Sequence, residues 1–66
     1  MEAWQERVIE EKKELDAKIV KLVSFMYGEA RSCDPGVDYD LLRSQLQSML
    51  DYSDVLGRRI YLFSPD

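Results

Sequence analysis

A chain of 66 residues has room for one domain at most, and its 13 acidic against 9 basic residues give a net charge of −4. That balance argues against long nucleic acid as a partner, because duplex binding needs a basic surface. With no histidine and one cysteine, the chain also lacks the common nucleophile and base pairs and an internal disulfide framework. We therefore expect no enzyme activity, no metal site and no cofactor.

The expected compartment is the cytoplasm. No apolar run approaches the roughly 18 residues of a membrane span, and the opening run Met1, Glu2, Ala3, Trp4 does not have the basic and then apolar character of a signal region. The single cysteine, Cys33, fits a reducing environment, where it is most simply an inert loop thiol. No membrane partner is expected.

The first predicted helix covers about residues 2–27. Its apolar residues recur at separations of three, four or seven, as expected for one helix face: Trp4, Val8, Leu15, Ile19, Leu22 and Met26. The charged residues between them are expected to form a solvated face: Glu6, Glu10, Glu11, Lys12, Lys13, Glu14 and Lys18. Gly28 is the expected stop, because glycine tolerates the left-handed conformation that ends many helices.

A loop is predicted over about residues 28–37, where Ser32, Asp34, Pro35 and Gly36 carry turn chemistry. Asp38 or Asp40 is expected to cap the amino end of a second helix over about residues 38–63. Its apolar seam has heptad spacing, with Ser53 in the one missing position: Leu42, Leu46, Met49, Leu56, Ile60 and Phe63. Further apolar residues widen this surface beyond what one partner helix would cover: Leu41, Leu50, Tyr52, Val55 and Tyr61.

These elements predict an all-α fold, an antiparallel two-helix hairpin that forms a single domain over residues 1–66. Gly57, inside the second helix, would let another helix approach closely, and Pro65 would end the structure. Domains of roughly 60 residues bury only about 60% of the surface of their unfolded chains. Since no disulfide or metal stabilises this one, we expect it to assemble into a helical homo-oligomer.

The candidate binding residues are aromatic and cationic. In an antiparallel hairpin the start of the first helix lies beside the end of the second, which brings Trp4, Arg7, Arg59 and Tyr61 to one end of the rod. Aromatic faces stack on bases, worth about 1–3 kcal/mol each, and arginine matches phosphate oxygens with two parallel hydrogen bonds. The alternative is that these aromatics are core residues, as aromatics at helical spacing usually are.

Many positions of both helices match, in the same order, the pattern of one known family. The matching positions in the first half are Trp4, Arg7, Val8, Glu11, Lys12, Glu14, Leu15, Asp16, Lys18, Ile19, Lys21, Leu22 and Phe25. Those in the second half are Leu41, Leu42, Gln45, Leu46, Met49, Tyr52, Leu56, Arg59, Ile60 and Phe63. In these positions the chain resembles a family of small phage proteins, the anti-CBASS cyclic-nucleotide sponges, related to short proteins of crAss-like phages. The family typically has tyrosine where Trp4 stands, and this chain is short for the family.

The resemblance implies a homohexamer in the host cytoplasm that binds cyclic di- and trinucleotides, such as cyclic GMP-AMP and cyclic triadenylate, without cleaving them. It implies that Trp4 stacks on a base and that Lys21, or the neighbouring candidate Lys18, contacts phosphate. Arg7, Arg59 and Tyr61 are added to the site from the hairpin geometry. The alternative function is a structural or adaptor hairpin that docks another protein through its surplus apolar surface.

Overall fold

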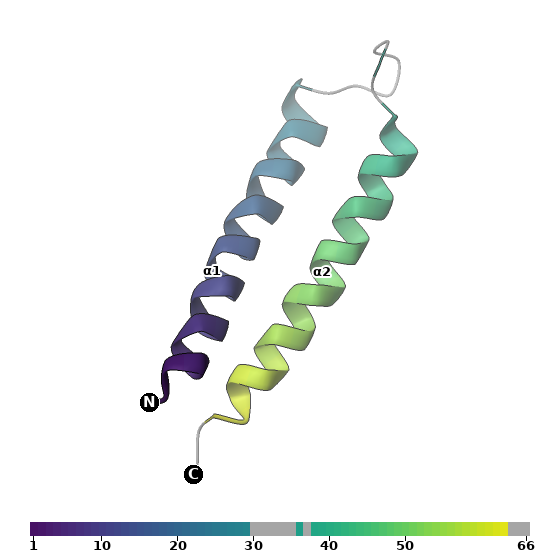
Figure 1. The fold of residues 1–66 in the computed structure, drawn as a ribbon. Coiled ribbons are helices and arrows are strands. Elements are labelled where there is room, and N and C mark those ends of the chain that lie inside the picture. The colour runs from purple at the N-terminus through teal and green to yellow at the C-terminus, as the bar shows by residue number, and fades with distance from the viewer. Residues whose placement is uncertain (30–35, 37, 64–66) are drawn as a thin grey trace.

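The computed structural model describes residues 1–29, 36 and 38–63. These residues form α1 (Ala3–Ser24), a π-helical turn η1 (Phe25–Glu29) and α2 (Tyr39–Tyr61), with no strand among them. The two helices lie side by side and antiparallel, so that the start of α1 is beside the end of α2 (Figure 1). The predicted all-α fold is confirmed, whereas the assembly of hairpins into an oligomer stays a prediction.

Near the start of each helix, a side-chain oxygen accepts a hydrogen bond from a backbone N–H group. At the start of α1, the Glu2 backbone N–H donates to Oε1 of Gln5 over 2.8 Å. At the start of α2, Oδ1 of Asp38 accepts a hydrogen bond from the Leu41 backbone N–H over 3.0 Å, so Asp38 is the cap and the expectation for this residue is confirmed.

The expected stop at Gly28 is wrong. The chain passes through Gly28 within the η1 turn, and among the described residues a positive φ occurs at Gly36, with φ 81°. In this region the backbone carbonyl of Met26 accepts a hydrogen bond from the Tyr39 hydroxyl over 3.2 Å. A contact from the next helix thus accompanies the π turn. Most of the predicted loop, with Cys33 and Pro35, lies outside the described residues, as does Pro65.

The two apolar seams face each other, but one layer of the contact is polar. Val8, Met26 and Leu56 are buried, and so is the hydroxyl-bearing Ser53. The expectation that Lys12 lies on the solvated face is wrong. Lys12 stands between Val8 and Leu15 in the helical period, and its ammonium group donates a hydrogen bond to Ser53 across the seam. The polar positions of the two seams therefore meet.

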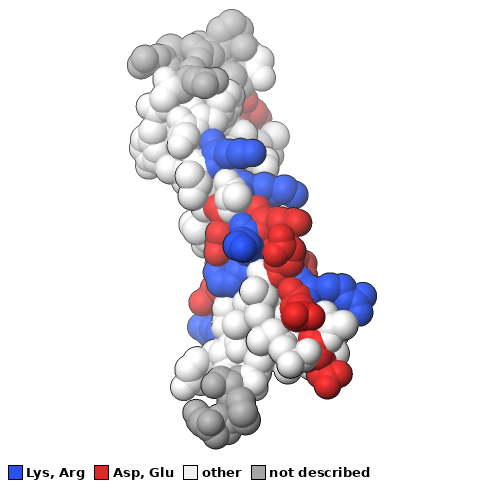
Figure 2. All heavy atoms as spheres, turned by 90° about the vertical axis from the view of Figure 1, so that its left-hand side faces the viewer, with Lys and Arg blue, Asp and Glu red and all other residues white. Residues whose placement is uncertain are grey.

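The chain forms a rod measuring 50 × 16 × 14 Å. Within the described part of the chain, neither helix is apolar enough over a sufficient length to span a membrane. Seen from the side of α1, Figure 2 shows acidic and basic side chains interspersed along the middle of the rod. On this face the acidic side chains continue from the middle of the rod down one edge, and the basic ones lie above and beside them.

Candidate functional site

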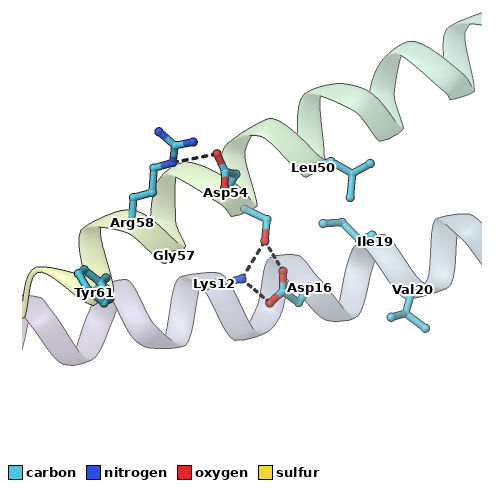
Figure 3. Close-up of a pocket in the computed structure, with 10 residues that line it drawn as sticks. Lys12, Asp16, Ile19, Val20, Leu50, Asp54, Gly57, Arg58 and Tyr61 are labelled. Atoms are coloured by element: carbon cyan, nitrogen blue, oxygen red, sulfur yellow. Dashed lines mark hydrogen bonds and ion pairs between the residues drawn. The ribbon is translucent and has the colours of Figure 1, made fainter.

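An open groove runs along one flank of the hairpin (Figure 3) and encloses about 690 Å³. We call it the lateral groove. It draws residues from both helices, which line it in this order along the chain: Lys12, Asp16, Ile19, Val20, Leu50, Ser53, Asp54, Gly57, Arg58 and Tyr61.

The floor of the lateral groove is a closed polar network. The Nζ atom of Lys12 donates to Oδ2 of Asp16 over 2.8 Å and to Oγ of Ser53 over 2.9 Å, and the Ser53 hydroxyl donates to Oδ1 of Asp16 over 2.5 Å. The hydrogen bonds from Lys12 and then Ser53 hold the pKa of the Asp16 carboxyl below its ordinary value of 3.8. The folded hairpin therefore favours the ionised form of Asp16, whose carboxylate accepts both hydrogen bonds.

The rest of the lateral groove is apolar along one wall and aromatic at one end. Val20 and Leu50 are exposed, and Tyr61 is 79% exposed. At the rim, Nε of Arg58 pairs with Oδ2 of Asp54 over 3.1 Å, and both side chains are largely in solvent. The lateral groove thus combines an ion-paired guanidinium and a phenol ring with an apolar wall.

A second hollow, which we call the end cleft, lies where α1 begins and α2 ends. It encloses about 480 Å³ and is lined by Trp4, Gln5, Arg59, Leu62 and Phe63. The indole of Trp4 meets the ring of Phe63 edge to face, with 5.1 Å between centroids and 86° between planes. Since 49% of Trp4 stays exposed, the contact orients the indole without covering it.

A third hollow lies at the other end of the hairpin, next to the η1 turn. It is lined by Met26, Tyr27, Tyr39, Arg43, Leu46, Gln47 and Leu50. The guanidinium of Arg43 stands 5.3 Å from the centre of the Tyr39 ring, a cation–π arrangement that occupies this ring face. This contact places the arginine side chain over the ring at the edge of the hollow.

The structure brings only some of the predicted site residues together. Trp4 and Arg59 share the end cleft, as the hairpin geometry required, but Tyr61 lines the lateral groove instead. Arg7, Lys18 and Lys21 are exposed on α1, outside the linings of the three hollows. The polar floor of the lateral groove was missed. Its signal was present in the sequence, because each apolar seam skips one position, and Lys12 and Ser53 fill those positions.

These features define a class: a small helical hairpin with open surface grooves and, in the part of the chain that the structure describes, no cluster of side chains suited to hold a metal. The chain belongs to the Sequestin family, whose sequence model matches residues 2–62. The family name denotes the sequestering of a ligand, a role of binding rather than turnover, and it agrees with the resemblance to the anti-CBASS sponges. The relation to crAss-like phage proteins stays a prediction.

No curated protein and no solved structure matches the chain. The proposed function therefore rests on the family match and on the geometry of the hairpin.

Proposed function

We propose that this protein is a phage anti-defence sponge that binds the cyclic di- and trinucleotide messengers of bacterial CBASS immunity in the host cytoplasm and holds them uncleaved. The observation that supports this most directly is the end cleft. It brings Trp4 and Arg59, from opposite ends of the chain, into one open hollow.

The chemistry of the end cleft suits a nucleotide. A cyclic oligonucleotide presents flat bases and a ring of phosphates, and an exposed indole offers the first a stacking surface while a guanidinium offers the second two hydrogen bonds. Phe63 holds the Trp4 ring before a ligand arrives, which lowers the entropy lost on binding.

The remaining site residues act from neighbouring copies in this proposal. Arg7, Lys18 and Lys21 line none of the three hollows of a single hairpin, so they reach a ligand only where hairpins assemble, as in the proposed hexamer. Several chains would then direct their cations at one compact dianion, and this local charge outweighs a net charge of −4 spread over each chain. Tyr61 supplies a second stacking ring from the lateral groove.

Retention without cleavage is consistent with the chemistry of the chain. Sequestration requires affinity alone, and it draws on neither a nucleophile nor a base. The aromatic and cationic residues named above supply that affinity.

Calorimetry with cyclic GMP-AMP and cyclic triadenylate tests the proposal. Wild-type protein is expected to bind at least one of them at micromolar concentration or below. Trp4→Leu keeps an apolar contact for Phe63 but cannot stack, and Arg59→Gln removes the guanidinium; each is expected to weaken binding roughly tenfold or more. Lys21→Ala is expected to weaken binding and leave the oligomer intact.

Lys13→Ala is the matched control, because Lys13 is an exposed cation of α1 that lines none of the three hollows. Its affinity should equal that of the wild type. Absence of heat with every cyclic nucleotide would reject the sponge and favour the adaptor hairpin, which the exposed apolar side chains also support. Ligand recovered in hydrolysed form after denaturation would instead indicate an enzyme.

A further inference from the structure

The hairpin exposes more surface than a monomer of its mass should. Its accessible area is 5312 Å², whereas the scaling of folded monomers gives about 4,300 Å² for its 7.7 kDa. The excess, about 1,000 Å², is close to the roughly 800 Å² that one partner contributes to an interface of standard size. The molecule therefore has the uncovered area that a stable dimer needs.

A large part of this apolar surface lies along α2. Leu41 is 66% exposed, Tyr52 45%, Val55 52% and Leu62 79%. With the polar residues between them they advance by alternating steps of four and three, one residue out of phase with the seam that faces α1: Leu41, Gln45, Ser48, Tyr52, Val55, Arg59 and Leu62. We call these seven residues the outer seam. Its spacing is that of a coiled-coil surface, and α1 covers the neighbouring face of the same helix.

We propose that the outer seam binds the outer seam of a second copy of this chain, α2 against α2, antiparallel about a two-fold axis. A self-complementary surface is the simplest partner for such a stripe, because one patch then serves both molecules. Heptad spacing allows registers that differ by seven residues. In the register proposed, Tyr52 and Val55 form the central layer, with Tyr52 opposite the partner's Val55 and the reverse.

The charges beside the outer seam select this register. Asp51 and Arg58 flank it on the same side, one heptad apart. In an antiparallel pair the flanking positions of the two helices lie opposite each other, and the central layer of Tyr52 and Val55 places Asp51 beside the partner's Arg58 twice. A shift by one heptad in either direction would instead bring Asp51 beside the partner's Asp51 or Arg58 beside the partner's Arg58.

Both charged groups are exposed, and each has a weak partner on its own helix. Arg58 has 80% of its side chain in solvent and pairs with Asp54 on its own helix. Exposed ion pairs of this type contribute little to stability. Asp51 is exposed and accepts one hydrogen bond from Gln47 over 3.0 Å. Turning either side chain toward a second copy therefore costs little free energy.

Sedimentation velocity of the full chain without ligand tests the interface. Because Arg59 and Leu62 also line the end cleft, the substitution is made at the centre of the outer seam. Val55→Glu is expected to weaken self-association at least about tenfold, since it places two carboxylates in an apolar layer. Val20→Glu is the control: Val20 is a similarly exposed valine, on α1, and its variant should sediment as the wild type. Far-UV circular dichroism reports whether each variant is folded.

A charge swap tests the register without touching the apolar layer. Asp51→Arg places two arginines beside each other at each end of the contact and is expected to weaken association, while Asp51→Arg combined with Arg58→Asp should restore it. A monomeric wild type, an unchanged mass in Val55→Glu, equal losses in Val55→Glu and Val20→Glu, or a double swap no stronger than the single variant would overturn the proposal. Since no ligand is present, these outcomes are independent of whether the protein binds cyclic nucleotides.

Discussion

Lys12 of α1 donates a hydrogen bond to Ser53 of α2, with 2.9 Å between Nζ and Oγ, in the middle of an otherwise apolar contact (Figure 3). A slip of the helices by one heptad would replace Ser53 with Leu46 or Ile60 and leave the ammonium group without its partner. An unpaired polar group in an apolar seam is costly. The polar layer therefore selects one register of the two helices, as a single buried polar residue does in coiled coils.

The first prediction concerns the energy of this contact. In a double-mutant cycle of Lys12→Met and Ser53→Ala, we expect a coupling of about 1–2 kcal/mol, because the bond joins a charged donor to a hydroxyl shielded from water. Urea unfolding at a fixed protein concentration measures it. The exposed pair Asp54 and Arg58 is the matched control, and its cycle should give about 0.5 kcal/mol or less. Equal coupling in the two cycles would contradict a special role for the polar layer.

Acid should destabilise the hairpin through Asp16. Its pKa in the folded state is lowered by the hydrogen bonds from Lys12 and Ser53, so the anion stabilises the fold at any pH above the ordinary value of 3.8. This stabilisation is lost as the pH falls below 3.8 and through the lowered folded-state pKa. We expect the difference in unfolding free energy between wild type and Asp16→Asn to be constant near neutral pH and to shrink over that acidic range. A difference that stays constant down to pH about 2 would be inconsistent with the lowered pKa.

Replacing Gly57 with alanine should stabilise α2. A Cβ atom at this position would stand 3.4 Å from Cε of Lys12, an ordinary contact with a flexible chain. The gain in helix propensity is then expected to raise the free energy of unfolding by up to about 1 kcal/mol. Gly57→Leu should have the opposite effect, because the larger side chain would displace Lys12 from Ser53. Thermal unfolding of both variants measures the sign, and destabilisation by alanine would show that Lys12 has no room to adjust.

The cap of α2 gives a fourth prediction. Asp38→Ala removes the acceptor for the Leu41 backbone N–H and should lower the free energy of unfolding by about 1 kcal/mol. Asp38→Asn keeps a side-chain oxygen and should recover most of that loss. Asp40→Asn is the control, because Asp40 stands in the same first turn without being the cap. Urea titrations of the variants would disagree with this account if Asp40→Asn cost as much as Asp38→Ala.

The helices and their facing stripes could be predicted from the sequence because apolar spacing reflects burial directly. The π turn could not. Its stretch contains Gly28, which by residue type favours a helix stop, and the partner of the Met26 carbonyl is a hydroxyl 13 residues further along the chain. A helix stop at Gly28 and a π turn through Gly28 are distinguished by this tertiary contact, which local sequence does not reveal.

The site was predictable in part for the same reason. The antiparallel arrangement was enough to bring Trp4 to Arg59, but Tyr61 lies on a different flank because a helical step of two residues from Arg59 turns the side chain away. Lys12 was assigned to the solvated face by its charge. Lys12 lies in the seam because it stands four residues after Val8 and three before Leu15. Here helical spacing indicates the face of the helix better than residue type does.

The network of Lys12, Asp16 and Ser53 also restricts how relatives of this chain can diverge. Each member satisfies the other two, so the loss of one leaves a donor or an acceptor without its partner, whereas replacement of all of them by apolar residues does not. Drift at these three positions should therefore be concerted, and an alignment of relatives should show them retained together or exchanged together, while the exposed charges of α1 vary independently.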